Sequence, residues 1–266
     1  MIIDFHTHIF PDNLAPRVIP QLAKNSGIQP YSDGTLSDTQ KKLKEWGFDG
    51  AVFLNIATAA RQQITINNTA AQINNNKNYF AFGSVHPDAP DAVEELKRIK
   101  SLGIKGVKMH PEYQEFYLDE KRMLPIYEAA QDLGLIMIFH AGCDRGYPDI
   151  CHAAPDKFLY IMKNFPNLKL VAAHFGGWSA WDMVDYFLIG KNIYLDTSMT
   201  VDYIESGRMK QMLLRHDPDK ILLASDCPWG SPAKALERIY EMNLPDDITE
   251  KITGKNALEL IGFEKK

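Results

Sequence analysis

Short runs of β-branched and aliphatic residues recur along this chain of 266 residues at nearly regular spacing, and this spacing most restricts the fold. Eight runs predict strands: Ile2–His6, Ala51–Ile56, Tyr79–Val85, Gly106–His110, Ile136–His140, Leu168–His174, Ile193–Ser198 and Ile221–Asp226. After a first gap of 49 residues, their starts lie 25 to 32 residues apart, close to the roughly 30 residues of one strand–helix unit. Strands that alternate with helices form a parallel sheet, and eight such units can close into a (β/α)8 TIM barrel. An open, doubly wound sheet is the alternative.

Helical patterns fill the spaces between the runs, as in residues 91–102 and 124–133. Glycines that suit a left-handed helix cap follow four helical stretches, at Gly47, Gly103, Gly134 and Gly190. The residues after Asp246 predict a final helix. We therefore expect an α/β protein with a single (β/α)8 barrel domain over residues 1–266, closed by a C-terminal helix.

The segments that leave the predicted strands are longer than those that enter them. Residues 10–35, 111–119 and 142–155 follow the first, fourth and fifth strands. In a βα barrel these segments lie at the C-terminal rim, where active sites are built, so the asymmetry points to a site at this rim. The first segment contains four prolines and is expected to be a long loop that acts as a lid.

Composition excludes several classes of function. The 29 Lys and Arg residues against 34 Asp and Glu give a net charge of −5, without the basic cluster that a nucleic-acid or membrane-surface partner would need. No apolar run approaches the roughly 18 residues of a membrane span, and the first residues lack the features of a signal peptide. Three cysteines are too few for a disulfide framework, so we expect a cytoplasmic protein. The expected partner is a small-molecule substrate, and assembly into a homo-oligomer is left open.

Residue types that bind metals stand at the ends of five predicted strands. They are His6 and His8 on the first, His110 on the fourth, His140 on the fifth, His174 on the sixth and Asp226 on the eighth. Side chains two apart on a strand share a face, so His6 and His8 can aim at one point. Imidazole and carboxylate suit a borderline cation such as Zn²⁺. Taken alone, Asp226 could instead cap the helix that follows. Together, the donors predict an open, catalytic metal site.

Four motifs in this chain resemble the amidohydrolase superfamily. They are Asp4-Phe5-His6-Thr7-His8, Phe139-His140-Ala141-Gly142, Ala173-His174-Phe175-Gly176-Gly177 and Ala224-Ser225-Asp226-Cys227-Pro228-Trp229. They are most similar to the amidohydrolase-related branch, which includes aminocarboxymuconate-semialdehyde decarboxylase and related decarboxylases, hydratases and lactonases. The resemblance implies that His6, His8, His140 and Asp226 bind one divalent metal, commonly Zn²⁺, with Mn²⁺ or another divalent ion as the alternative. It also implies that His174 is the catalytic histidine.

Other residues near the predicted rim are candidates for holding the substrate. They are Lys108, His110, Arg145, Trp178 and Trp229. Lys108 and His110 could hold a carboxylate or carbonyl oxygen. Alternatively, Lys108 is a buried lysine paired with a carboxylate, or Lys108 or Glu112 bridges two metals as in binuclear members of the superfamily. Arg145 could clamp an anion in bidentate fashion or simply face solvent. The two tryptophans could wall a pocket or pack against loops.

Two reactions fit these residues. Hydrolysis of a C–O or C–N bond in a small carboxylate-bearing or cyclic metabolite is expected first: Asp226 would accept a proton from a metal-activated water and His174 would stabilise the oxyanion. The alternative is non-oxidative decarboxylation of an aromatic or enoic acid, in which Asp226 or His174 protonates the carbon that loses CO₂. A barrel that binds metal without catalysis is disfavoured, because stability would not require donors at the functional rim.

Overall fold

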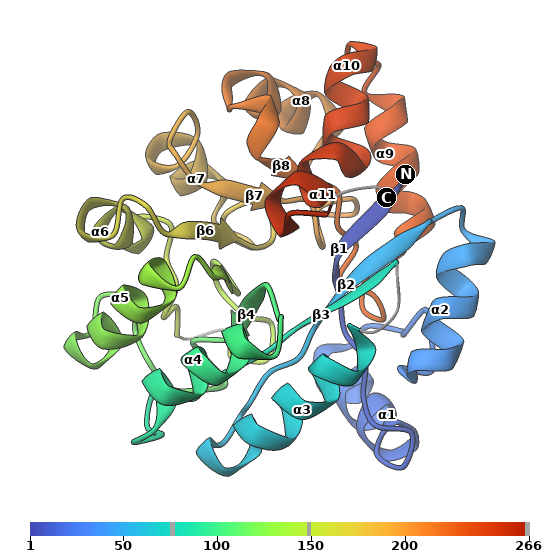
Figure 1. The fold of residues 1–266 in the computed structure, drawn as a ribbon. Helices are drawn as coiled ribbons and strands as arrows, with labels where there is room; N and C mark the ends of the chain where they lie inside the picture. Colours follow the sequence, from blue (N-terminus) through green and yellow to red (C-terminus); the bar gives the residue numbers. More distant parts are fainter. Residues whose placement is uncertain (75–77, 148–149, 264–266) are drawn as a thin grey trace. The chain divides into compact units, whose positions relative to one another are not determined.

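The computed structural model describes residues 1–74, 78–147 and 150–263. Contacts divide the chain into two compact units, which we call unit 1 (Met1–Phe53 and Asp196–Lys266) and unit 2 (Leu54–Leu195). Each unit contains parallel strands with helices between them along the chain (Figure 1).

Unit 1 is organised around the first strand. Its strands are β1 (Ile3–Thr7), β2 (Gly50–Leu54) and β8 (Ile221–Leu222). Its helices are α1 (Ala15–Ser26), α2 (Leu36–Glu45), α8 (Ser206–Arg215), a 3₁₀ turn (Pro218–Lys220), α9 (Pro232–Glu241), α10 (Asp246–Glu250), a π-helical turn (Lys251–Lys255) and α11 (Asn256–Ile261). Asp4 of β1 lies opposite Ala51 of β2, while Phe5 N–H donates to the carbonyl of Leu223. The backbone of β1 is therefore paired on both sides.

The described residues of unit 2 contain five strands. They are β3 (Tyr79–Phe82), β4 (Gly106–Met109), β5 (Ile136–Phe139), β6 (Lys169–Ala172) and β7 (Tyr194–Asp196). Strands β4 to β7 pair in chain order, while Gly83, just after β3, forms an isolated bridge with Val107 of β4. The helices are α3 (Gln63–Ile73), α4 (Ala92–Ser101), α5 (Leu124–Asp132), α6 (Lys157–Asn164) and α7 (Trp181–Phe187), with 3₁₀ turns at Ala60–Gln62 and Lys121–Met123. Ile138 of β5 lies opposite Lys108 of β4 and Val171 of β6, in parallel register. Every residue of β4 and β5 is buried, as is typical of parallel strands covered on both faces.

All eight predicted strands are present, but most end earlier than predicted. The eighth stops at Leu222 rather than Asp226, and the sixth stops at Ala172 rather than His174. His174 and Asp226 have positive φ angles of 57° and 71°, which lie outside the extended region, so neither residue can belong to a strand. The functional residues therefore follow the strands and are carried by the turns that leave them.

The predicted helices and caps agree closely with the structure. Helix α4 covers 92–101 of the predicted 91–102, and α5 covers 124–132 of the predicted 124–133. The four predicted cap glycines, Gly47, Gly103, Gly134 and Gly190, have φ between 63° and 84°. Glycine adopts this left-handed region without the steric cost that a Cβ atom brings.

Two predicted segments are different in the structure. The loop predicted over residues 10–35 contains helix α1, whose first turn accepts Pro16 and whose inward face buries Ala15 and Ile19. The single helix predicted after Asp246 is instead α10, a π-helical turn and α11. Gly254 lies in this turn where a Cβ atom would be 1.9 Å from the carbonyl oxygen of Met1, so the turn packs directly on the first residues.

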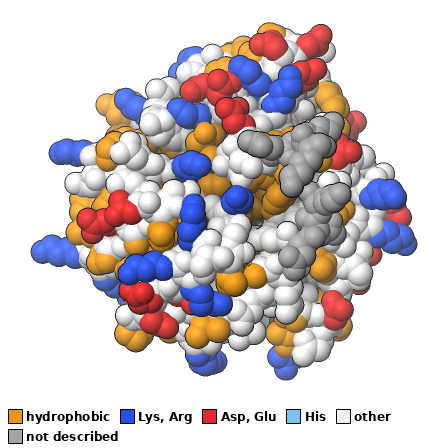
Figure 2. Space-filling model, viewed as in Figure 1, with side chains coloured by type: hydrophobic (Ala, Val, Ile, Leu, Met, Phe, Trp, Pro, Cys, Tyr) orange, Lys and Arg blue, Asp and Glu red, His pale blue; other side chains and the backbone are white. Residues whose placement is uncertain are grey.

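The face seen in Figure 2 carries both Lys or Arg and Asp or Glu side chains. Within the described ranges, no helix combines the length and the apolar character needed to cross a membrane.

Candidate metal and catalytic site

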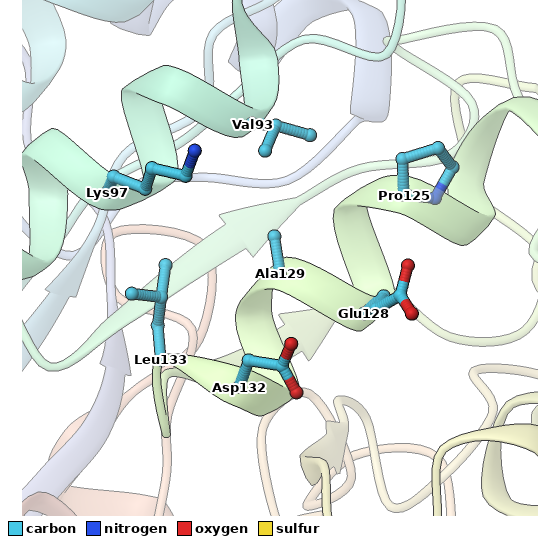
Figure 3. Close-up of a pocket in the computed structure, with 7 residues that line it drawn as sticks. All are labelled: Val93, Lys97, Pro125, Glu128, Ala129, Asp132 and Leu133. Carbon is cyan, nitrogen blue, oxygen red and sulfur yellow. The ribbon is translucent and has the colours of Figure 1, made fainter.

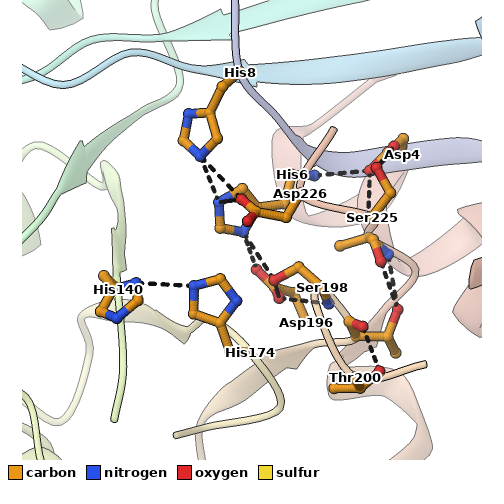
Figure 4. A network of polar contacts seen from close by, with 12 residues as sticks. Asp4, His6, His8, His140, His174, Asp196, Ser198, Thr200, Ser225 and Asp226 are labelled. Carbon is orange, nitrogen blue, oxygen red and sulfur yellow. Dashed lines mark hydrogen bonds and ion pairs between the residues drawn. The ribbon is translucent and has the colours of Figure 1, made fainter. Parts of the chain in front are cut away.

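Three predicted ligands meet in unit 1. His6 Nε2 lies 3.1 Å from His8 Nε2 and 3.2 Å from Asp226 Oδ1, and His8 Nε2 lies 3.1 Å from the same Asp226 oxygen (Figure 4). Backbone pairing brings them together, because Asp226 N–H donates to the His6 carbonyl and His8 N–H donates to the carbonyl of Cys227. His6 is fully buried and Asp226 is 7% exposed. The expectation that donors from both ends of the chain converge is therefore met for these three side chains.

The geometry of this His6–His8–Asp226 cluster suits a divalent cation. A tetrahedral site with metal–ligand bonds of about 2.0–2.2 Å has edges of about 3.3–3.6 Å between ligand atoms. The observed separations of 3.1–3.2 Å come close to these edges. Two imidazole nitrogens and a carboxylate oxygen are also the donor types that Zn²⁺ and similar ions accept. The residues present therefore fit a bound metal ion.

Asp226 does not cap the next helix. The cap of α9 is Ser231, whose side chain accepts a hydrogen bond from the N–H of Lys234. Asp226 is one of the few residues other than glycine with a positive φ angle, which costs free energy unless the surroundings hold it in place. His174 shares this property. Such strain is concentrated at functional sites. The positive φ of Asp226 and the capping of α9 by Ser231 therefore both favour a functional role for Asp226 over a capping role.

Two buried residues that we did not predict contact Nδ1 of His6, the ring nitrogen that faces away from the cluster. Asp196 Oδ2 lies 2.8 Å from His6 Nδ1, and Ser198 Oγ lies 3.2 Å from the same nitrogen. Both lie in the run that predicted the seventh strand, with Asp196 as the last residue of β7, and both are 0% exposed. An acidic residue at this strand end was the available signal, but only the histidine-bearing strand ends and the eighth were considered from the sequence.

Asp4 ties the first strand to the turn that carries Asp226. Its Oδ1 accepts the backbone N–H groups of His6 at 3.2 Å and Ser225 at 3.0 Å, and its Oδ2 accepts the Ser225 hydroxyl. Burial raises the pKa of the Asp4 carboxyl to about 7, although the hydrogen bonds from Ser225 and the backbone oppose the rise. Asp4 thus fixes the backbone beside two candidate ligands, His6 and Asp226, without itself joining the cluster.

The stability of an Asp4 variant should therefore depend on whether the new side chain still has an oxygen that accepts these hydrogen bonds. Asp4→Ala leaves two buried N–H groups without their acceptor, and we expect the free energy of unfolding to fall by about 2–5 kcal/mol. Asp4→Asn keeps an oxygen for both N–H groups, and we expect a loss below about 1.5 kcal/mol. Urea unfolding of the two variants measures the difference. Equal losses would show that these hydrogen bonds do not link the strands.

Unit 2 brings together a second group of predicted residues. His140 Nδ1 lies 2.9 Å from His174 Nε2, and the His110 ring stacks on the His140 ring with centroids 4.2 Å apart. Tyr113 stacks on His110 at 3.8 Å. Asp144 Oδ2 lies 3.4 Å from His110 Nε2 and 3.9 Å from His140 Nε2. His140, predicted as a metal ligand, and His174, predicted as the catalytic histidine, are thus in direct contact.

Glu112 joins this second group but does not make it a convincing cation site. Glu112, His110 and His140 are buried and close enough to share an ion. Burial raises the pKa of Glu112 to about 7, against a hydrogen bond from the backbone of His152. However, His110 Nδ1 already accepts the N–H of Tyr113 at 3.4 Å, and its Nε2 faces Asp144. We therefore assign His110 to hydrogen bonding rather than to metal binding.

The remaining predicted residues differ in exposure. Lys108 is 1% exposed on β4, whereas Arg145 is exposed on the segment after β5. Trp178 and Trp229 are half-buried. The backbone of Trp178 pairs with that of Gly142, where a Cβ atom would lie 2.2 Å from the Trp178 nitrogen, so this contact requires glycine. The backbone of Trp178 thus packs against the segment after β5, and the role of its side chain stays a prediction.

Burial raises the pKa of the Cys227 thiol to about 12, which keeps it protonated at neutral pH. A protonated thiol is a poor nucleophile, in agreement with the sequence, where we assigned no nucleophilic cysteine.

A surface pocket lies between helices α4 and α5 of unit 2 (Figure 3). It is lined by Val93, Lys97, Pro125, Glu128, Ala129, Asp132 and Leu133. None of these is a predicted site residue, and the pocket contains no histidine or cysteine, so we assign it no catalytic role.

Comparison with known proteins finds several relatives, and two of them represent the two kinds of enzyme among them. The 2-amino-3-carboxymuconate-6-semialdehyde decarboxylase of Dictyostelium discoideum is 26% identical over 239 residues, which cover 75% of this chain and 66% of the relative. The dihydroorotase of Helicobacter acinonychis (strain Sheeba) is 26% identical over 162 residues, which cover 55% of this chain and 46% of the relative. The chain therefore spans about two thirds of the first relative and about half of the second.

Solved structures share the fold across almost the whole chain. An uncharacterised TIM-barrel protein, Bb4693 of Bordetella bronchiseptica, has a TM-score of 0.77 with 20% identity and covers 98% of both chains. A dihydroxybenzoic acid decarboxylase of Polaromonas sp. JS666, solved with bound manganese, has a TM-score of 0.74 with 18% identity and covers 100% of this chain and 98% of the other. The predicted α/β TIM-barrel fold is thereby confirmed.

The family model for amidohydrolases matches residues 3–263, a span that begins at the start of β1 and includes all of the motifs that carry the metal-binding residue types. With the fold and the His6–His8–Asp226 cluster in agreement with that match, this chain belongs to the amidohydrolase family.

Proposed function

We propose that this protein is a metal-dependent, non-oxidative decarboxylase that releases CO₂ from a small aromatic or enoic carboxylic acid. The observation that carries the proposal is the relative that aligns with 75% of the chain, which is a 2-amino-3-carboxymuconate-6-semialdehyde decarboxylase. The manganese-containing decarboxylase with the same fold adds support. From the sequence we placed hydrolysis first, but the dihydroorotase that favours it aligns with only 55% of the chain. Decarboxylation therefore becomes the preferred reaction and hydrolysis the second candidate.

We propose one divalent cation per chain, held by His6, His8 and Asp226, with His140 as the fourth ligand. The separations within the His6–His8–Asp226 cluster support the first three ligands. The assignment of His140 rests on the resemblance of its motif to that of the superfamily. Zn²⁺ is the first candidate because of the donor types, and Mn²⁺ is the second because a protein of the same fold binds it.

The cation would supply a fixed positive charge that binds substrate oxygen and stabilises the negative charge left when CO₂ departs. His174 would then protonate the carbon whose bond to the carboxylate has broken. Because Nε2 of His174 is hydrogen-bonded to His140 Nδ1, we assign Nδ1 as the atom that transfers this proton. Lys108 and His110 would hold a second polar group of the substrate, and Arg145, Trp178 and Trp229 stay weaker candidates for substrate contacts.

If the reaction is hydrolysis, the same side chains have different tasks. Asp226 would accept the proton of the attacking water, and His174 would donate a hydrogen bond to the oxyanion. The cytoplasmic location, the single domain and the small-molecule partner also stay predictions.

The reaction is tested by incubating metal-loaded protein with two panels of compounds. One panel contains hydroxybenzoic and enoic acids, and the other contains cyclic amides, lactones and esters. We expect CO₂ release from a member of the first panel, with a product that has lost the carboxyl group and gained a proton. The His174→Gln variant serves as the matched control for contaminating activity. Ring opening in the second panel without CO₂ release would establish the hydrolase instead.

A further inference from the structure

The side of the His6 ring that faces away from the cluster contacts a carboxylate. Asp196 Oδ2 lies 2.8 Å from His6 Nδ1, and both side chains are 0% exposed. A carboxylate offers only acceptors, so this contact places the proton on Nδ1 of the imidazole. With one proton held on Nδ1, Nε2 presents its lone pair when a cation, rather than a proton, lies between Nε2 and Asp226 Oδ1. That nitrogen is the one that points toward His8 Nε2 and Asp226 Oδ1.

The carboxylate of Asp196 is itself held in one orientation. Its other oxygen, Oδ1, accepts the backbone N–H of Ser198 at 3.0 Å and also the Ser198 hydroxyl. Because the backbone N–H is a fixed donor, Oδ1 must stay on the Ser198 side and Oδ2 must stay on the His6 side. Burial makes any rearrangement that leaves these groups without partners costly.

We propose that Asp196 is a positioning residue that holds His6 in the Nδ1–H tautomer and so presents Nε2 to a divalent cation. The inference rests on the proposed function in one respect, namely that a cation binds at the His6–His8–Asp226 cluster. It does not depend on which reaction follows. Carboxylates that orient metal-binding histidines in this way contribute about 10–100-fold to metal affinity or activity.

The Asp196→Asn variant tests the proposal because Ser198 determines how the new amide must lie. The amide oxygen is needed to accept the Ser198 N–H, which turns the amide NH₂ toward His6. An NH₂ group donates, so His6 Nδ1 must become an acceptor and the proton must move to Nε2. A protonated Nε2 cannot bind a metal. The substitution therefore reverses the tautomer at nearly constant side-chain volume.

Ser198→Ala is the matched control. It removes the hydroxyl that lies 3.2 Å from His6 Nδ1 but keeps the backbone N–H and the Asp196 carboxylate. We expect Zn²⁺ affinity within about threefold of the native value for Ser198→Ala, and a loss of about 10–100-fold for Asp196→Asn. Affinity is measured on the full chain by competition for Zn²⁺ with a chromophoric chelator.

A second measurement reports the tautomer of His6 directly. Two-bond ¹H–¹⁵N correlation spectra of the chain saturated with Zn²⁺, with His6 assigned by substitution, distinguish Nδ1–H from Nε2–H. We expect Nδ1–H in the native protein and Nε2–H in Asp196→Asn. Native Nε2–H, or equal Zn²⁺ affinity in folded Asp196→Asn and native protein, would overturn the positioning role. Normal Zn²⁺ binding without CO₂ release would instead contradict only the proposed reaction.

Discussion

Asp226→Asn is expected to lower bound metal from about one equivalent per chain to a small fraction of that, and to reduce CO₂ release at least about 10³-fold. Asp226 is the anionic member of the His6–His8–Asp226 cluster, and its Oδ1 lies within 3.2 Å of both imidazole nitrogens. An asparagine has nearly the same shape but no charge, so it cannot neutralise a divalent cation. The effect on metal content and on turnover should therefore appear together.

Metal analysis of the purified variant, alongside the native protein, measures the first effect, and a CO₂ assay measures the second. Asp246→Asn is a suitable control because Asp246 is exposed on α10. It should keep both metal and activity. Full metal occupancy in Asp226→Asn would show that the carboxylate is not a ligand, and the proposed site would then be wrong.

His174→Gln is expected to keep the metal and to lower kcat by about 10²–10⁴-fold, the usual contribution of a general acid. Glutamine can still form a hydrogen bond to His140, so the arrangement of the two residues after β5 and β6 should persist. Glutamine cannot transfer a proton to carbon, so the chemical step should fail. Whereas Asp226→Asn should lose both metal and turnover, His174→Gln should lose turnover alone.

Steady-state kinetics with metal analysis on the same sample provides the measurement. His216→Gln, at the end of α8, is the control for replacing a buried histidine. It should leave kcat unchanged. Native turnover in His174→Gln would remove His174 from the mechanism while leaving the metal site in place.

The strands could be predicted because a parallel strand that is buried on both faces is simply a continuous apolar run, as Ile136–Phe139 illustrates. The three candidate ligands of unit 1 could be predicted for a related reason, since each stands at or just after the end of such a run. Helix α1 was missed because Pro16 and Pro20 concealed its helical pattern. One proline lies in the first turn, where the missing N–H costs nothing.

The supporting contacts could not be predicted, because they join residues that are distant in sequence. Asp196 is 190 positions from His6, and Ser225 is 221 positions from Asp4. No local sequence pattern predicts such pairs, because only the folded arrangement of the strands brings these residues together. The sequence motifs also could not distinguish the two reactions, because hydrolysis and decarboxylation would use the same metal-binding and catalytic residues. The alignment with a decarboxylase over most of the chain supplied that preference.

The central claim is that donors from both ends of the chain bind a single cation. A crystal structure of the protein grown with Zn²⁺, with anomalous data collected on both sides of the zinc edge, tests it most directly. We predict one strong anomalous peak, bonded to Nε2 of His6, Nε2 of His8 and Oδ1 of Asp226, with His140 as the fourth ligand. A peak bonded to other residues, or no peak at this cluster in zinc-saturated crystals, would contradict the account.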